Sequence, residues 1–361
     1  MRMTSQSVTG DAPDMIPEIW GHDGFLADIA RSHASRRMHH AWLLSGPIGI
    51  GKAGIARLAA AWLLSETRQA GALFDGDSQA VKIDAEDAGA NLVLNGAHPD
   101  YLAITPQLED NKSGQIKVDQ IRKLIPFMMH KPARGGWRVA IIDSMDEVNR
   151  NGANAMLKLL EEPPPQAVIF LISSRIGQLP PTIRSRCRLV RMNALADDDC
   201  FAALGQIWPD ADSDQLEILA RLSQGAPGQA VKLAESGAAD LYQLVCSLLH
   251  APQLDAAALT GVCAKWGRGT AAGRDVRAGA VFCMDRLLRN AALQASGVQP
   301  DRLCRFETPV VAHLASRHTA GQLAGFHQAF LSEAAKAEGL YLDFARFLER
   351  HLSKIYEKTL P

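Results

Sequence analysis

The sequence predicts an α/β protein, with a parallel sheet flanked by helices in the first half of the chain and helices alone in the second. Three observations carry this prediction. A short apolar run at 41–45 leads through a glycine-rich loop into an Ala-rich helical pattern. A continuous apolar run at 138–143, typical of a buried parallel strand, ends in a carboxylate. From about residue 193 no strand pattern appears, and apolar residues recur at helical spacing to the end.

The elements of the first half follow from the same periodicities and from the turn signals between them. These predict, in order, a helix over 24–35, a strand over 41–45, a helix over 51–64, a strand over 101–104, a helix over 118–128, a strand over 138–143, a helix over 149–162, a strand over 168–172, a short helix within 178–187 and a strand over 188–192. About five mostly parallel strands thus alternate with helices, which is an α/β nucleotide-binding architecture. Residues 66–98 lose periodicity, so we expect an excursion from the core there.

At 361 residues the chain is long enough for two or three domains. Residues 1–14 are polar and aperiodic, and we expect them to be disordered. The α/β core is predicted over 15–192. A small helical bundle follows over 193–237, and a separate helical array occupies 238–361.

Composition excludes several classes of protein. Charged residues make up 21% of the chain and the formal net charge is −1, which gives no global drive towards nucleic acid. No apolar run approaches the roughly 20 residues of a membrane span. The N-terminus lacks the pattern of a signal peptide, so we expect no export. The six cysteines include no C-x-x-C pair, which argues against zinc and against a disulfide framework. We therefore expect a cytoplasmic protein with reduced thiols.

The glycine-rich loop has the spacing of a phosphate-binding loop. Gly46-x4-Gly51-Lys52 fits that motif, and Gly49 loosens the backbone between its two ends. Such a loop cradles phosphates with backbone N–H groups at a helix N-terminus. The motif then needs Ser or Thr to hold Mg²⁺, whereas this chain has Ala53, which offers no oxygen. The alternative is a plain glycine turn between a core strand and a helix.

The carboxylate that ends the second apolar run is Asp143. In a phosphate-binding-loop fold such an aspartate lies next to the loop and reaches the metal. Active ATPases of the family considered below place a second acid directly after it, but here that residue is Ser144. Asp146 and Glu147 come later and are expected to point elsewhere. The changes at Ala53 and Ser144 together argue against hydrolysis at this site.

Three segments together resemble one family: residues 40–52, 138–164 and 179–187 look like the AAA+ subunits of the bacterial clamp loader. That machine loads the ring-shaped sliding clamp for DNA polymerase III. Residues 98–101 fit the same family. The resemblance implies an AAA+ core, a helical lid over 193–237 and a helical collar that holds the oligomer together over 238–361.

The family contains motor subunits that hydrolyse ATP and a subunit that does not. Ala53 and Ser144 point to the second kind. Motor subunits carry a nucleotide-sensing arginine near the start of a lid helix, where this chain has Gln229. The vestigial nucleotide site would comprise Gly46, Gly49, Gly51, Lys52, Ala53 and Asp143. Ser173 or Ser174 would occupy a second sensing position, where a packing role is an equal alternative.

The resemblance assigns the main functional role to Arg186. In the family this arginine acts in trans, reaching the ATP of a neighbouring motor subunit, with Ser185 and Cys187 as structural neighbours. A guanidinium suits this task because it is always charged and matches phosphate geometry. The alternative is a surface arginine at a strand edge.

The resemblance also implies partners: the motor subunits, the delta subunit and, through the assembled complex, the sliding clamp and primed DNA, with no membrane involved. Weak or no ATP binding is expected. Because residues 54–100 contain no cysteine, the four-cysteine zinc module common in the family is not expected. Two alternatives are an ATP-hydrolysing motor subunit and a small-molecule kinase with a phosphate-binding loop.

Overall fold

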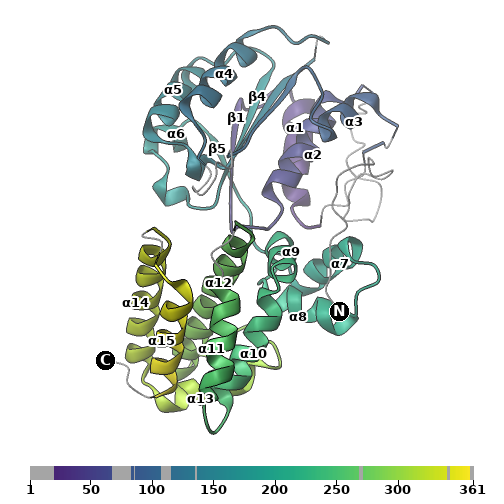
Figure 1. The fold of residues 1–361 in the computed structure, drawn as a ribbon. Coiled ribbons are helices and arrows are strands. Elements are labelled where there is room, and N and C mark those ends of the chain that lie inside the picture. The colour runs from purple at the N-terminus through teal and green to yellow at the C-terminus, as the bar shows by residue number, and fades with distance from the viewer. Residues whose placement is uncertain are drawn as a thin grey trace. The chain divides into compact units, whose positions relative to one another are not determined.

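The computed structural model describes residues 20–66, 83–84, 86–106, 115–134, 136–267, 271–339 and 342–357 (Figure 1). The described residues fall into two compact units. The sheet unit contains residues 20–207 together with Ala226–Gly228, and the helical unit contains Trp208–Gly225 and the residues from Gln229 onward. Each unit is described by itself below.

The sheet unit is built on five parallel strands in the order β2-β3-β4-β1-β5. The strands are β1 (Ala41–Ser45), β2 (Tyr101–Ile104), β3 (Arg138–Asp143), β4 (Ala167–Ser173) and β5 (Arg188–Arg191). The predicted five-stranded parallel sheet is confirmed. The central strands β1, β3 and β4 are almost wholly buried, as expected for continuous apolar runs that are covered on both faces.

Helices cover both faces of the sheet (Figure 1). Alternate strand residues pack on opposite sides: Trp42 and Leu44 belong to one apolar cluster, and Ala41 and Leu43 to the other. The first cluster includes residues of α1 (Asp23–Ala34), α2 (Lys52–Leu64) and α3 (Ala88–Leu94). The second includes residues of α4 (Val118–Met129), α5 (Arg150–Glu161) and α6 (Pro181–Arg184). Two 3-10 helices, η1 (Met145–Glu147) and η2 (Ile176–Gln178), follow β3 and β4, and α7 (Asp197–Ile207) completes the unit.

Helix α3 lies within the segment predicted to be an excursion without periodicity. With only seven residues it is too short to show a clear apolar period. Its start is fixed by Asp87, whose side chain accepts a hydrogen bond from the backbone N–H of Ala90 at 2.6 Å. Residues 67–82, and the segment 1–14 for which disorder is predicted, lie outside the described residues.

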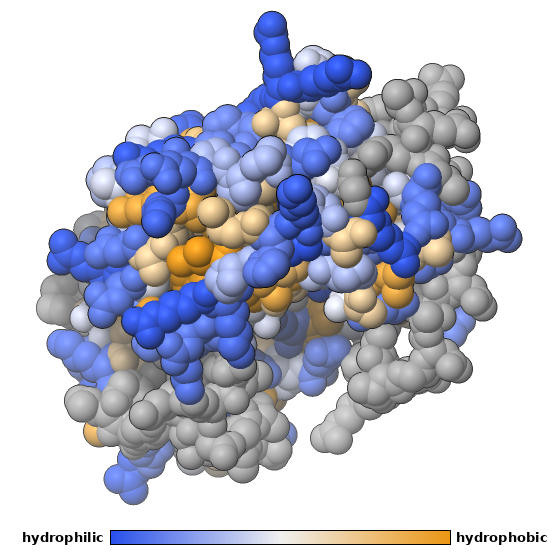
Figure 2. Space-filling view, turned by 90° about the horizontal axis from the view of Figure 1, so that it is seen from above, coloured by the Kyte–Doolittle hydropathy of each residue, from blue (hydrophilic) through white to orange (hydrophobic). Residues whose placement is uncertain are grey.

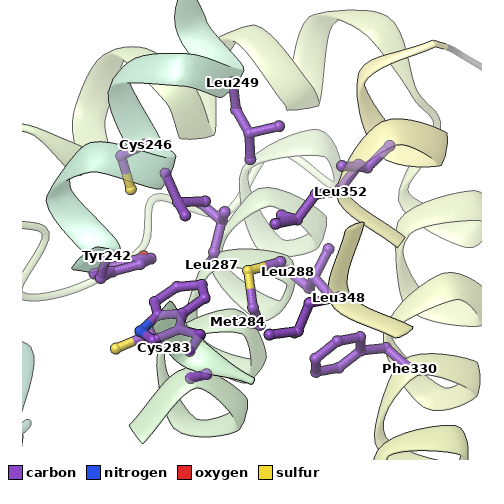
Figure 3. Packing of buried hydrophobic residues seen from close by; sticks show 14 of the residues in the cluster. Tyr242, Cys246, Leu249, Cys283, Met284, Leu287, Leu288, Phe330, Leu348 and Leu352 are labelled. Atoms are coloured by element: carbon purple, nitrogen blue, oxygen red, sulfur yellow. The ribbon is translucent and has the colours of Figure 1, made fainter. Parts of the chain in front are cut away.

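The helical unit packs its helices around one apolar core. These are α8 (Ser213–Leu222), α9 (Pro227–Glu235), whose first two residues belong to the sheet unit, α10 (Ala238–His250), α11 (Ala256–Trp266), α12 (Ala271–Ala295), α13 (Glu307–Arg317), α14 (Ala320–Gly339) and α15 (Phe344–Tyr356). Figure 3 shows side chains of α10, α12, α14 and α15 converging, among them Leu249, Leu287, Phe330 and Leu352. All four are fully buried, so apolar burial holds the unit together.

The division into two units differs from the three-part division predicted above. Residues 193–207 lie with the sheet unit, and residues 229–237 lie with the helical unit. A separate lid over 193–237 therefore stays a prediction, as do the boundaries of the collar.

The surface seen from above is mainly hydrophilic, with apolar residues showing between the charged ones (Figure 2). Scattered exposure of this kind is ordinary for a folded protein. Within the part of the chain that the structure describes, no helix combines the length and the apolar character needed to cross a membrane.

Candidate functional site

The glycine loop joins the end of β1 to the start of α2, and each of its glycines has a steric reason. A Cβ on Gly46 would lie 2.2 Å from the carbonyl oxygen of Met192, so no side chain fits there. Gly49 and Gly51 have φ values of 83° and 94°, in the left-handed region that side chains disfavour. The predicted phosphate-binding backbone is therefore present as a strand, a glycine loop and a helix.

Lys52 turns back onto this loop. Its Nζ donates hydrogen bonds to the carbonyl oxygens of Gly46 at 2.7 Å and Pro47 at 2.5 Å, and to Ser174 Oγ at 3.0 Å. An ammonium group has three N–H donors, and these contacts use all of them. The residue is only 6% exposed, and desolvation lowers the pKa of Lys52 despite the opposing charges of Asp143 and Asp146.

Two further loop carbonyls also have donors. The backbone N–H of Gly228 donates to the carbonyl of Gly49 at 2.8 Å, and His22 Nε2 lies 3.1 Å from the carbonyl of Ile50. Burial lowers the pKa of His22, which favours the neutral ring. Sequence reasoning missed His22, because no motif connects it with a loop 28 residues away.

The residues present do not fit a magnesium nucleotide. Ala53 packs against the apolar cluster of the sheet unit and supplies no oxygen where the metal would need one. Asp143 ends β3 and is close enough for its charge to oppose the pKa shift of Lys52. The structure thus brings the predicted residues of the vestigial site together, but Lys52 hydrogen-bonds the carbonyls of its own loop.

Asp146, which follows Asp143 by three positions, is engaged at the end of β4. Its carboxylate accepts hydrogen bonds from Ser173 Oγ and from the backbone N–H of Ser174, both at 2.6 Å. It thereby caps the carboxyl end of β4, which lies beside β3 in the sheet. Glu147 instead pairs with Arg175 at 3.1 Å. Asp146 and Glu147 lie in η1, directly after β3, and linear spacing did not reveal their partners.

Arg186 lies in the turn between α6 and β5, half exposed. Its Nη1 donates to the carbonyl of Thr182 at 3.1 Å, and its Nη2 pairs with Glu161 at 2.8 Å. Glu161 is the last residue of α5 and is itself half exposed. The guanidinium is thus fixed at the surface by one carbonyl and one carboxylate, a pairing that the sequence motif did not indicate.

The two residues beside Arg186 shape this turn. Ser185 Oγ donates to the carbonyl of Thr182 at 3.2 Å. Cys187 is partly buried against the apolar cluster under α4 and α5, and desolvation raises the pKa of its thiol to about 12. A protonated, shielded thiol is not a nucleophile, so packing accounts for Cys187.

The glycine loop and Arg186 lie at opposite ends of the sheet. In the parallel register Trp42 faces Arg188 and Ser45 faces Arg191. The glycine loop follows Ser45, whereas Arg186 precedes β5, so β1 separates them by on the order of 13 Å of strand. Arg186 therefore does not complete the phosphate loop of its own chain.

A five-stranded parallel sheet in this order, with a glycine loop and lysine after β1, defines a phosphate-binding-loop protein of the AAA+ type. Residues 21–196, just under half of the chain, match the family model described as DNA polymerase III, delta subunit. This match agrees with the resemblance to clamp-loader subunits that the sequence predicts.

Two relatives carry the name DNA polymerase III subunit delta′. The protein from Pseudomonas aeruginosa is 36% identical over 198 residues, which cover 55% of this chain and 56% of the relative. The protein from Escherichia coli is 29% identical over 61% of this chain and 62% of the relative. The E. coli subunit tau is also 29% identical, over 63% of this chain and 33% of its own length. The chain thus aligns with little more than half the length of its delta′ relatives.

Among solved structures, the chain resembles a gamma subunit-related protein of DNA polymerase III from Thermotoga maritima. The alignment covers 92% of this chain and 99% of that one, at 17% identity and a TM-score of 0.43.

Proposed function

We propose that this chain is a clamp-loader subunit of DNA polymerase III that does not hydrolyse ATP and that lends Arg186 to the ATP site of a neighbouring motor subunit. The observation that carries the proposal is the contrast between the two cations. Lys52 has all three donors engaged by its own loop and by Ser174, whereas Arg186 is held at the surface, at the opposite end of the sheet.

The chemistry of phosphoryl transfer explains what Arg186 would do. Negative charge spreads over the γ-phosphate oxygens in the transition state, and a positioned guanidinium stabilises it. An arginine supplied in trans increases the rate by roughly 10³- to 10⁵-fold in GTPase systems. The chain itself would then need no ATP, no Mg²⁺ and no zinc. Its partners would be the motor subunits and the delta subunit, and it would reach the sliding clamp and primed DNA through the assembled complex in the cytoplasm.

The test is reconstitution with the motor and delta subunits, followed by measurement of ATP turnover stimulated by clamp and primed DNA. Arg186→Ala should abolish most turnover at the site that borrows this arginine, and Arg186→Lys should restore little because it lacks the planar fork. Arg184→Ala, which removes an exposed arginine two residues away, is the matched control and should behave as wild type. Unchanged turnover in Arg186→Ala would overturn the proposal.

The second candidate is an ATP-hydrolysing motor subunit, favoured by the retained Lys52 and by the similarity to tau. Phosphate release by the isolated chain separates the two candidates. We expect no turnover above background. Turnover that disappears in Lys52→Ala would instead establish a motor subunit.

A further inference from the structure

We infer that Glu161 is the positioning residue for Arg186: its carboxylate orients the guanidinium so that the remaining donors face an anion outside the chain. This inference rests on the proposed function of Arg186. Its basis is the 2.8 Å ion pair between Arg186 Nη2 and Glu161 Oε1, which joins the end of α5 to the turn after α6.

Two contacts hold the guanidinium of Arg186. A guanidinium at the end of a flexible side chain is oriented when two of its nitrogens are held. Thr182 holds Nη1 through its carbonyl at 3.1 Å, and Glu161 holds Nη2. The hydrogen bond to Thr182 uses one of the five N–H donors and the ion pair lies at Nη2, so further donors are left for a contact with phosphate oxygens.

Glu161 occupies an unfavourable position for its own helix. It is the last residue of α5, where the partial negative charge of the helix end disfavours a carboxylate. The pairing with Arg186 offsets this cost, and no other ion pair of Glu161 occurs among the described residues. Glu161 therefore gains its favourable interaction from Arg186 and not from the helix.

Both members of this ion pair are accessible to solvent. The side chains of Arg186 and Glu161 are 35% and 49% exposed, so neither is sealed in the interior. An exposed ion pair of this kind contributes little to folding. Its effect should therefore appear in the orientation of Arg186 and not in the stability of the fold.

The experiment uses the reconstituted complex and compares Glu161→Ala, Glu161→Gln, Arg186→Ala and the double variant Arg186→Ala/Glu161→Ala. Glu162→Ala is the matched control, because Glu162 is the adjacent exposed carboxylate at the same helix end. Glu161→Ala should lower kcat for stimulated ATP turnover by roughly two- to fivefold. An exposed ion pair can change the fraction of molecules in which Arg186 is correctly oriented by about that factor. KM for ATP should be unchanged, since Arg186 acts in the transition state. Glu161→Gln keeps an acceptor oxygen and should lie between Glu161→Ala and wild type.

The outcomes separate the two proposals. Glu161→Ala in the Arg186→Ala background should have no further effect, because the residue acts only through Arg186. If Arg186→Ala lowers turnover while Glu161→Ala equals Glu162→Ala, the positioning role is wrong and the proposed function stands. A further loss in the double variant would likewise reject positioning in favour of a structural role. If Arg186→Ala itself leaves turnover unchanged, the proposed function fails, and the role of Glu161 fails with it.

Discussion

Two buried cations, one chosen from each unit, have opposite kinds of partner. In the helical unit Arg286, on α12, is 1% exposed and forms an ion pair with Glu307 at 2.7 Å. In the sheet unit Lys52 is 6% exposed and hydrogen-bonds only two carbonyls and a hydroxyl. One charge is neutralised by a carboxylate in direct contact, and the other is merely solvated by the loop.

The surroundings of Glu307 explain why its pair belongs to the fold. Its carboxylate accepts hydrogen bonds from Arg286 Nε and Nη2, from Tyr242 Oη at 2.8 Å and from the backbone N–H of Cys304 at 2.8 Å. Burial alone would raise the pKa of Glu307, but the hydrogen bonds and charge of Arg286 outweigh it and the pKa is lowered. The same contact raises the pKa of Arg286 against desolvation. Both residues are thus held in their charged forms.

Lys52 differs because, among the described residues, no carboxylate lies at hydrogen-bonding distance to offset its desolvation. Its pKa is therefore lowered. Arg286 and Lys52 are both buried but have different partners, so burial of a charge does not by itself reveal its role. Arg286, bound directly by a buried anion, joins α12 to α13, whereas Lys52 is held by carbonyls of the glycine loop and by Ser174.

The largest expected effect lies in the helical unit. Glu307→Ala leaves Arg286 buried without its anion and should lower the free energy of unfolding by about 3–5 kcal/mol. Urea denaturation followed by circular dichroism measures this change. Arg286→Met/Glu307→Gln removes both charges but keeps an acceptor for Tyr242, so it should lose much less. Arg350→Ala breaks an exposed pair and should cost less than about 1 kcal/mol. Equal losses in all three would contradict the distinction.

Lys52 should respond weakly in the same assay. Lys52→Met removes three hydrogen bonds together with the desolvation cost of the charge, so we expect a change within about 1 kcal/mol near neutral pH. The lowered pKa of Lys52 fixes the pH dependence. Between the folded pKa and the ordinary value of 10.5 the unfolded chain binds more protons, so wild type should gain stability relative to Lys52→Met as pH rises through that window. A loss of stability relative to the variant over this range would contradict it.

The smallest effect concerns His351, a 3% exposed histidine of the helical unit. Desolvation lowers the pKa of His351, although the carbonyl of Phe347 and the charge of Glu333 oppose this, while Arg350 and Lys354 reinforce it. The neutral ring is therefore the stable form. Its contribution is fully present above pH 6.5 and is lost as pH falls from there through the folded pKa, with a slope of at most about 1.4 kcal/mol per pH unit.

His351→Phe should flatten that part of the stability profile between pH 7 and pH 5. Thermal denaturation of both proteins in matched buffers provides the measurement. Parallel profiles for wild type and variant would show that His351 does not titrate on unfolding.

Much of the sheet unit was predictable because its central strands β1, β3 and β4 are continuous apolar runs that are buried on both faces. The five strands, the glycine loop and the helices beside it follow from local patterns. Helix α3 did not follow, because seven residues are too few to show a period. The role of Asp146 did not follow either, since its partners Ser173 and Ser174 lie 27 and 28 residues further along the chain.

The sequence by itself determined which chemical groups are present: no oxygen at Ala53, no acid at Ser144, and a guanidinium at Arg186. Only the tertiary structure decided what these groups contact. In the folded chain the N–H donors of Lys52 are hydrogen-bonded to loop carbonyls and to Ser174, 122 residues away. Glu161 lies beside Arg186 at the far end of the sheet. The physical reason is that side-chain identity is local, whereas hydrogen bonds and ion pairs depend on distances that are set by the packing of helices on the sheet.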